Sequence, residues 1–143
     1  MRYGPQMQLP DGLVAVVKRE CPTCVLVEPV LRELGAEVWC QDDAGWFDHD
    51  DTELELSYRL GIETVPTLMR VEDGEETARV VGWSREQWEQ LTGRTGLGAD
   101  LPEHRPGCGS LSVDPFRIDA LEARYGGTGL GSRRVELADL EDE

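Results

Sequence analysis

Two cysteines three positions apart stand between a strand-like run and a helix-like run. Residues 12–19, GLVAVVKR, are mostly apolar and rich in valine, and a Pro-Asp-Gly turn signal precedes them. Such a run predicts a buried parallel strand. Over residues 22–34 apolar side chains recur at helical spacing, and Gly35 stands where a helix-ending residue belongs. The sequence therefore places Cys21 and Cys24 at the start of a helix that follows a buried strand.

The elements after this helix alternate between strand and helix patterns. They are a strand over 37–41, an acidic loop over 42–51 and a short helix over 52–61 with Asp51 or Thr52 as its N-cap. Residues 64–82 predict two strands around an Asp73-Gly74 turn, a dipeptide typical of hairpins. The pattern up to this point is that of an α/β protein.

A last helix over 84–93 has strong start signals. Ser84 and Gln87 have the spacing of a capping box, and Trp83 and Trp88 occupy the positions of a hydrophobic staple. The order is then βαβαββα, which predicts an α/β fold with a mixed four-stranded sheet flanked by helices and an antiparallel hairpin at one edge.

The amino-acid composition changes after Gly93. A stretch rich in glycine and proline follows and predicts a loop or linker. One further helix is predicted from Asp114 as N-cap and Pro115 as first residue to about Tyr125, with Gly126 and Gly127 as its end. The chain then closes with a short acidic segment. We therefore predict a domain over residues 1–93 and a C-terminal extension over 94–143.

The charge balance restricts the partners. The chain has 143 residues, with 14 Lys and Arg against 29 Asp and Glu, a net charge of −15. Phosphate backbones and anionic lipids repel such a polyanion, so we expect no nucleic acid and no membrane as partner. No apolar run approaches the ~20 residues of a membrane span, and the start lacks the apolar stretch of a secretory signal. We expect a cytoplasmic protein.

The cysteines are too few for a disulfide-built mini-protein. They are Cys21, Cys24, Cys40 and Cys108. In a reducing compartment a CxxC is more often catalytic or metal-binding than a stable disulfide. A zinc site needs two more ligands, and the remaining cysteines and histidines form no second CxxC or CxxH pair. We therefore expect no bound metal.

The spacing of Cys21 and Cys24 suits redox chemistry. A disulfide between positions i and i+3 closes readily when the second cysteine lies in the first helical turn, and this geometry is expected to expose the first sulfur. The free N–H groups and the macrodipole there favour a thiolate, which is the attacking species in thiol–disulfide exchange. Cys21 is thus the candidate nucleophile and Cys24 the resolving thiol. Pro22 fits the first turn, where its missing N–H is no loss.

Taken together, these motifs resemble the thioredoxin family over roughly residues 12–93. Pro29 matches the proline that kinks the active-site helix of that family. The segment GIETVPTL, residues 61–68, looks like the one that carries the family's cis-proline, so Pro66 is expected to be cis and Val65 to precede it. The EDGEE turn and the VVGW segment fall at the corresponding places before the last helix.

The resemblance implies a thioredoxin-like fold, thiol–disulfide oxidoreductase activity and a part in cell redox homeostasis. It implies a redox-active disulfide with no bound cofactor. The expected partners are a disulfide-containing protein or a low-molecular-weight thiol, and a reductase that supplies the electrons. In a cytoplasm, reduction is the expected direction. An extended substrate segment is expected to pair with the backbone of Val65 as an added strand. The expected substrate-binding residues are Pro22, Thr23, Val65, Pro66, Gly82 and Trp83.

Departures from the family pattern keep an alternative open. Glu20 stands where thioredoxins usually carry a tryptophan, and Ala15 stands where they carry a buried aspartate that serves the resolving cysteine. The proline after Cys21 is a glutaredoxin feature, but the Gly-Gly and paired aspartates for glutathione are absent after the hairpin. The alternative function is a non-catalytic binding or adaptor module in which the CxxC is vestigial.

The other two cysteines have different surroundings. Cys40 lies in a predicted strand, where core packing is the main expectation. Cys108 is flanked by glycines, which allow a tight, exposed loop with free N–H groups around the sulfur. It is a candidate accessory thiol, either a redox or substrate-binding group docked near Cys21 or a loop cysteine without chemistry.

Overall fold

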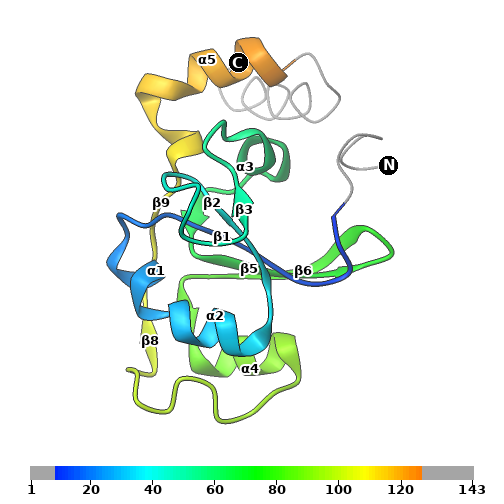
Figure 1. Cartoon of the computed structure of the whole chain (residues 1–143), viewed down its shortest axis with the longest axis vertical. Helices are drawn as coiled ribbons and strands as arrows, with labels where there is room; N and C mark the ends of the chain where they lie inside the picture. Colours follow the sequence, from blue (N-terminus) through cyan, green and yellow to red (C-terminus); the bar gives the residue numbers. More distant parts are fainter. Residues whose placement is uncertain (1–8, 127–143) are drawn as a thin grey trace, which may run out of the picture.

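A mixed sheet forms the centre of the molecule in the computed structural model, which describes residues 9–126 (Figure 1). Its strand order is β3-β2-β1-β5-β6. The strands are β1 (Gly12–Val17), β2 (Glu37–Cys40), β3 (His49–Asp50), β5 (Thr67–Glu72) and β6 (Glu75–Val81). β1 pairs with β2 in parallel and with β5 in antiparallel fashion, and β6 completes the hairpin. The mixed sheet and the hairpin edge are as predicted.

Helices cover both faces of this sheet. They are α1 (Pro22–Leu26), α2 (Glu28–Leu34), α3 (Glu55–Leu60), α4 (Arg85–Thr92) and α5 (Pro115–Tyr125), with a 3₁₀ turn η1 at Leu111–Val113. Figure 1 shows α2 and α4 on one side of the sheet and α3 on the other. The order of these elements confirms the α/β class and the thioredoxin-like fold.

The helix predicted over 22–34 is two helices, α1 and α2, which meet at Val27. Pro29 has no N–H to donate to the carbonyl one turn earlier, which weakens the ladder at this point. Gly35 ends α2 with a left-handed φ of 67°, as predicted. The interruption leaves Cys21 and Cys24 on a short helix of their own.

Two sequence predictions before the hairpin are wrong in detail. The sheet has five strands because β3, in the predicted acidic loop, pairs with β2, where the His49 ring stacks on Trp39 at 4.0 Å. The third helix begins at Glu55 rather than residue 52. Leu54 precedes it in a left-handed conformation, and the Asp51 carboxylate accepts the N–H groups of Leu56 and Ser57 from outside the helix.

The turn and cap signals further along are confirmed. Asp73 and Gly74 both take positive φ, 56° and 78°, as the tightest hairpin turns require. Ser84 caps α4 by accepting the Gln87 N–H at 3.2 Å. The rings of Trp83 and Trp88 meet edge to face, with centroids 5.0 Å apart.

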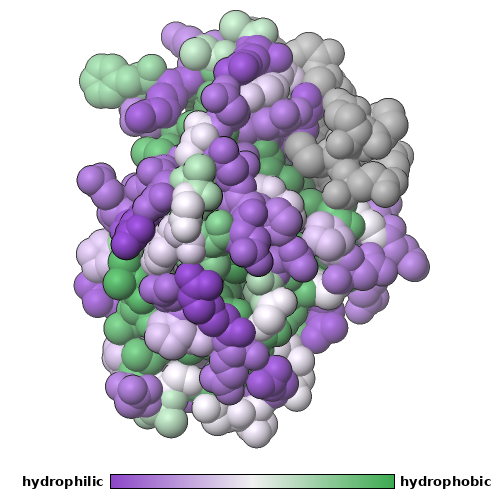
Figure 2. All heavy atoms as spheres, viewed as in Figure 1, coloured by the Kyte–Doolittle hydropathy of each residue, from purple (hydrophilic) through white to green (hydrophobic). Residues whose placement is uncertain are grey.

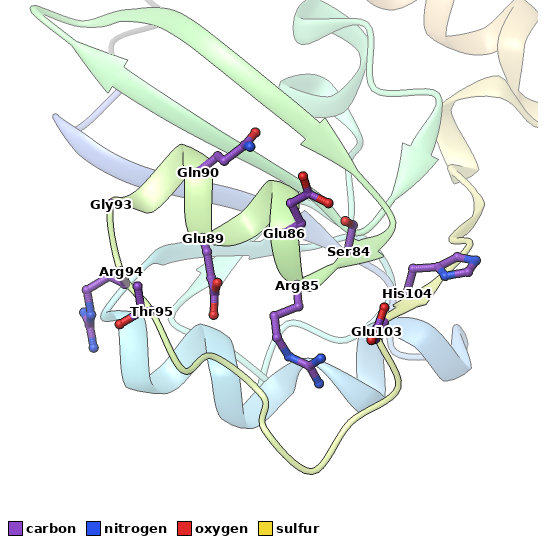
Figure 3. A pocket seen from close by; sticks show the side chains of 10 residues that line it. All are labelled: Ser84, Arg85, Glu86, Glu89, Gln90, Gly93, Arg94, Thr95, Glu103 and His104. Atoms are coloured by element: carbon purple, nitrogen blue, oxygen red, sulfur yellow. The ribbon is translucent and has the colours of Figure 1, made fainter.

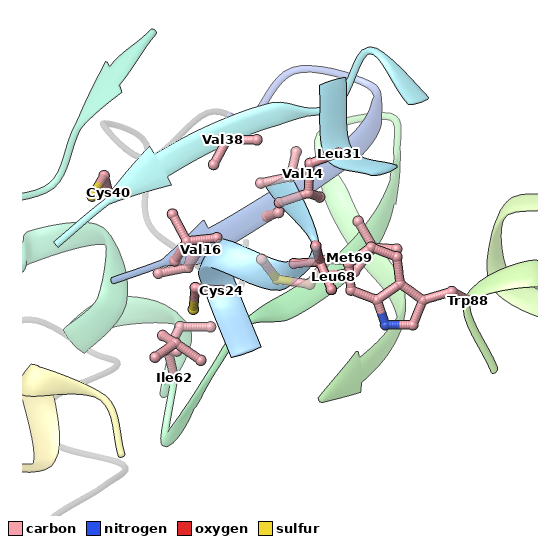
Figure 4. Packing of buried hydrophobic residues seen from close by; sticks show 14 of the residues in the cluster. Val14, Val16, Cys24, Leu31, Val38, Cys40, Ile62, Leu68, Met69 and Trp88 are labelled. Atoms are coloured by element: carbon pink, nitrogen blue, oxygen red, sulfur yellow. The ribbon is translucent and has the colours of Figure 1, made fainter. Parts of the chain in front are cut away.

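The main core lies between the sheet and helices α1, α2, α3 and α4. Figure 4 shows its members, among them Val14, Val16, Leu31, Leu68, Met69 and Trp88. Cys21, Cys24 and Cys40 belong to the same cluster. The CxxC is therefore built into the packed interior rather than placed on a surface loop.

The glycine- and proline-rich stretch after α4, predicted as a loop or linker, is a loop that pairs with the domain at two places. Short strands β8 (His104–Arg105) and β9 (Cys108–Gly109) pair with β7 (Trp83–Ser84) and β4 (Thr64–Val65) respectively. Its glycines and prolines carry no strand pattern of their own, and the pairing depends on partners distant in sequence. This stretch runs along the molecule beside α1 (Figure 1).

The last described helix, α5, begins as predicted. The Asp114 carboxylate accepts the Phe116 N–H at 2.9 Å, and Pro115 is the first helical residue. With α3 it encloses a second apolar cluster of Leu54, Tyr58, Leu121 and Tyr125. Gly127, predicted to end this helix with Gly126, and the acidic segment at the end of the chain lie outside the described residues.

The visible surface of the molecule is mainly hydrophilic, as expected for a chain with many charged residues. Figure 2 shows mainly hydrophilic side chains on the visible face, with apolar residues between them. Within residues 9–126 no helix combines the length and the apolar character that crossing a bilayer needs.

Candidate dithiol site

Cys21 is the N-cap residue of α1. Its backbone is extended, and its Sγ accepts the Cys24 N–H at 3.4 Å, while Pro22 fills the first turn as predicted. The same sulfur lies 3.7 Å from the Val65 carbonyl oxygen. The side chain is 0% exposed, so the predicted exposure of this sulfur is wrong. The reason is the extension, which covers it.

Cys24 lies one turn further along, inside the core. Its Sγ accepts the Lys18 backbone N–H at 3.4 Å, and the residue is 0% exposed. Figure 4 shows it beside Val16 and Ile62. The apolar surroundings disfavour a negative charge on this sulfur.

The two thiols have opposite pKa shifts. The pKa of Cys21 is lowered to about 5, first because the Cys24 thiol donates to its sulfur, and then through the Cys108 thiol and backbone N–H groups, although burial opposes the shift. Burial raises the pKa of Cys24 far above its usual range, and donation to Cys21 adds to this rise. Cys21 is therefore a thiolate at neutral pH while Cys24 keeps its proton.

Cys108 is the third sulfur of the cluster. Its Sγ lies 2.7 Å from that of Cys21, and its residue is half-buried. This distance exceeds the ~2.05 Å of a disulfide bond, and all four cysteines are free thiols. Burial raises the pKa of Cys108, and the neighbouring Cys21 raises it further. Of the two sequence alternatives for this residue, the position is that of a thiol docked near Cys21.

The backbone beside the CxxC is already paired. The Val65–Pro66 peptide bond is cis, as the resemblance predicted. In the β4–β9 pair, Val65 lies opposite Cys108 and Thr64 opposite Gly109. The chain's own extension thus occupies the position where an added substrate strand was expected.

Three of the other predicted substrate-binding residues, Thr23, Gly82 and Trp83, lie against the extension. Thr23 Oγ1 donates to the Pro106 carbonyl at 2.7 Å, and Trp83 Nε1 donates to the Pro102 carbonyl at 2.7 Å. Gly82 has a φ of 70°, and a β-carbon there would lie 3.2 Å from the Gly107 nitrogen. Pro22 is exposed. A role of these residues toward an external substrate stays a prediction.

Asp42 is a structural residue that the sequence did not reveal. Its carboxylate accepts the backbone N–H groups of Arg19 at 2.6 Å and Glu20 at 3.0 Å, which fixes the loop before Cys21. The signal was available, since an acidic residue directly after a parallel strand can accept N–H groups from the neighbouring strand's loop. Glu20 itself is exposed, and the position of the family's buried aspartate is Ala15, fully enclosed in β1.

The ammonium group of Lys18 contacts the extension. Lys18 Nζ donates to the Gly109 carbonyl at 2.9 Å and so fastens β9 beside the CxxC. Its backbone N–H alone reaches Cys24. The cation thus holds the extension rather than either thiol of the pair.

Cys40 is in the core, as predicted, with 0% exposure. Its Sγ lies 3.3 Å from Asp42 Oδ1, and burial raises its pKa. Within the described part of the chain no group of three or more His, Cys, Asp or Glu residues is arranged to hold a metal ion.

A separate hollow of about 740 Å³ lies between α4 and the stretch that follows it (Figure 3). Its lining residues include no cysteine. Arg85, at its edge, already donates to the carbonyls of Leu97, Gly98 and Leu101. This hollow is therefore not continuous with the thiol cluster.

Comparison with known proteins returns no matching protein-family profile. Among solved structures, the chain is similar to a reduced thioredoxin pre-protein from Schistosoma mansoni, with 22% identity and a TM-score of 0.44 over 58% of this chain and 78% of that one. It is also similar to a mutant thioredoxin from Halobacterium salinarum, with 29% identity and a TM-score of 0.40 over 56% of this chain and 73% of that one.

Proposed function

We propose that this protein is a thiol–disulfide oxidoreductase in which Cys21 and Cys24 alternate between dithiol and disulfide. The observation that carries the proposal is the pairing of a thiolate and a thiol one helical turn apart. Cys21, with a pKa lowered to about 5, supplies the nucleophile, and Cys24 supplies a protonated second sulfur within reach.

The first step forms a mixed disulfide. The Cys21 thiolate attacks one sulfur of a target disulfide. The target S–S bond breaks, and its other sulfur leaves as a thiolate that takes up a proton. Cys21 then carries no charge, so the hydrogen bond that Cys24 donated to it is lost.

The second step releases the target. Cys24 gives up its proton and attacks Cys21 Sγ, which forms the Cys21–Cys24 disulfide and expels the remaining target sulfur. Because Ala15 replaces the family's buried acid, the departing target thiolate is the proposed acceptor of the Cys24 proton. The target gains two electrons and two protons. The pair supplies both electrons and the Cys24 proton, and solvent supplies the second proton.

The low pKa of Cys21 bears on the direction of exchange. A stabilised thiolate stabilises the dithiol form, which makes the pair more oxidising than thioredoxin, whose cysteine has a pKa near 7. We propose a midpoint between about −270 mV, the thioredoxin value, and about −120 mV, that of a strong periplasmic oxidant. Reduction of targets stays the proposed direction for a cytoplasmic setting, with electrons from a reductase or a small thiol and with no bound cofactor.

A disulfide-reduction assay tests the proposal. Wild-type protein, Cys21→Ser and the control Cys40→Ser are compared on bis(2-hydroxyethyl) disulfide with dithiothreitol as electron source. We expect a rate above the uncatalysed one for wild type and Cys40→Ser, and none above it for Cys21→Ser. Equal rates for wild type and Cys21→Ser would remove the basis of the proposal.

A second candidate function is a binding or adaptor module without turnover. The observation that favours it is the complete burial of Cys21 and Cys24 beneath the extension. The same assay separates the two functions, because an adaptor gives equally negligible rates with and without Cys21.

A further inference from the structure

The thiol cluster has one sulfur that faces outward. Cys21 and Cys24 are both 0% exposed, whereas Cys108 is half-buried. From the surface inward, the order of the three sulfurs is Cys108, Cys21 and Cys24. Cys108 Sγ is 2.7 Å from Cys21 Sγ, and Cys21 Sγ accepts the N–H of Cys24. Any disulfide that arrives from solvent therefore meets Cys108 first.

The covering segment, which we define as residues 104–110, is firmly attached. Besides the β7–β8 and β4–β9 pairs, it accepts hydrogen bonds from Thr23 Oγ1 and Lys18 Nζ, and the Ser110 N–H donates to the Glu63 carbonyl at 3.0 Å. Both ends of the segment and its middle thus have partners in the domain.

The backbone of the covering segment packs closely against the backbone at Val65. A β-carbon at Gly107 would lie 2.2 Å from the Val65 carbonyl oxygen, so only glycine allows this approach. Buried side chains hold the next residues, since Gln41 Nε2 donates to Ser110 Oγ at 2.7 Å and Ser112 Oγ donates to the Ile62 carbonyl at 2.9 Å. These contacts hold the segment in place over Cys21, which is 0% exposed.

We propose that Cys108 is the third redox thiol of the site, receiving an external low-molecular-weight disulfide at the surface and passing the disulfide to Cys21, from which it moves to Cys24. This inference rests on the proposed function. A small disulfide is the fitting substrate class, because β9 occupies the strand edge at Val65 that an extended protein segment would need.

The relay has three exchange steps. Cys108 loses its proton and attacks the external disulfide, which forms a mixed disulfide and releases the first small thiol with that proton. The Cys21 thiolate attacks Cys108 Sγ, which forms the Cys21–Cys108 disulfide and releases the second small thiol, protonated by solvent. Cys24 attacks Cys21 Sγ, which forms the Cys21–Cys24 disulfide, and Cys108 leaves and takes the Cys24 proton. One disulfide becomes two thiols, and one dithiol becomes a disulfide.

A trapping experiment tests the middle step in the full chain. Reduced Cys24→Ser is exposed to bis(2-hydroxyethyl) disulfide, quenched with acid, alkylated and mapped by mass spectrometry. We expect a Cys21–Cys108 disulfide, because the sulfur that would resolve it is gone. A hydroxyethyl group on Cys21 beside an alkylated, free Cys108 would overturn the relay. This readout needs no turnover.

A rate measurement tests the first step. Cys108→Ser should reduce the same small disulfide roughly tenfold or more slowly than wild type, with Cys40→Ser as the matched control near the wild-type rate. A wild-type rate in Cys108→Ser, together with an inactive Cys21→Ser, would refute the relay and leave the proposed function intact. A wild-type rate in Cys21→Ser would refute both.

Discussion

Cys21 and Cys40 occupy comparable places in the fold and have opposite chemistry. Cys40 ends β2, and Cys21 follows β1, the strand parallel to it. Both side chains are 0% exposed. Yet the pKa of Cys21 is lowered to about 5, while burial raises the pKa of Cys40.

The difference comes from what each sulfur faces. Cys21 begins a helix and receives hydrogen bonds from two thiols and from backbone N–H groups. Cys40 has the Asp42 carboxylate at 3.3 Å, and a thiol beside a carboxylate keeps its proton. Burial alone therefore does not decide whether a thiol is reactive, because the donors around the sulfur outweigh it at Cys21.

Removing the reactive sulfur should have the largest effect. Cys21→Ser should lower the rate of disulfide exchange by about 10³-fold or more, because a serine hydroxyl is neither ionised nor able to form the mixed disulfide. The rate with bis(2-hydroxyethyl) disulfide measures this. A residual rate within tenfold of wild type would mean that another thiol, Cys40 included, supports the exchange.

Removing the resolving sulfur should have the next largest effect. Cys24→Ser should still react once but should turn over about 10²-fold more slowly, because nothing one helical turn away displaces the captured sulfur. Intact-protein mass spectrometry should find a species that remains disulfide-linked through Cys21. Full turnover in this variant would show that Cys24 does not resolve it.

Displacing the covering segment should expose Cys21 to solvent and raise its rate of alkylation. Gly107→Ala places a methyl group 2.2 Å from the Val65 carbonyl oxygen, so the segment must shift, at a cost of about 1–3 kcal/mol of unfolding free energy. Alkylation of Cys21 by iodoacetamide should then accelerate about tenfold.

Gly109→Ala is the matched control for this change, because a β-carbon there meets no atom within 4 Å. It should leave the alkylation rate of Cys21 unchanged. Identical rates in the two glycine variants would show that the covering segment does not limit access.

The pH dependence should separate the two cysteines by ionisation. The pKa of Cys21 lies below its unfolded value, so its thiolate contributes to stability in full above about pH 8.5 and this contribution is lost as the pH falls through about 5. The exchange rate should decline in the same range. The ultraviolet thiolate absorbance that Cys21→Ser removes should titrate near pH 5, and a midpoint near 8.5 would contradict the assigned ionisation.

Replacing the unreactive sulfur should have the smallest effect. Cys40→Ser should change the exchange rate by less than about twofold and the unfolding free energy by about 1 kcal/mol, because the serine hydroxyl can still reach Asp42. Chemical denaturation and the exchange assay together check this. A strong loss of rate at unchanged stability would place Cys40 in the chemistry after all.

The parts of the fold that the sequence predicted are those with local signals. The valine run of β1, the Asp73-Gly74 turn and the Ser84 and Asp114 caps each act within a few residues of the element they define. The two-residue strands β3, β7, β8 and β9 were missed, because their formation depends on distant partners. Nothing near Val65 in the sequence shows that Cys108 will lie opposite it.

The site was predicted to a similar extent. The CxxC at a helix start follows from neighbouring residues, and the cis bond before Pro66 was expected from the family resemblance; both are present. The burial of Cys21 could not be predicted, because the glycine-rich composition around residue 107 is equally typical of a linker. Only the structure shows that Gly107 provides close backbone contact at Val65.

The redox equilibrium of the Cys21–Cys24 pair tests the central claim most directly. The protein is equilibrated in glutathione buffers of graded potential, quenched with acid, alkylated and mapped by mass spectrometry. We predict one two-electron transition that links Cys21 to Cys24, with a midpoint between about −270 and about −120 mV. If Cys21 and Cys24 remain free thiols in the most oxidising buffer, the protein is not a dithiol oxidoreductase.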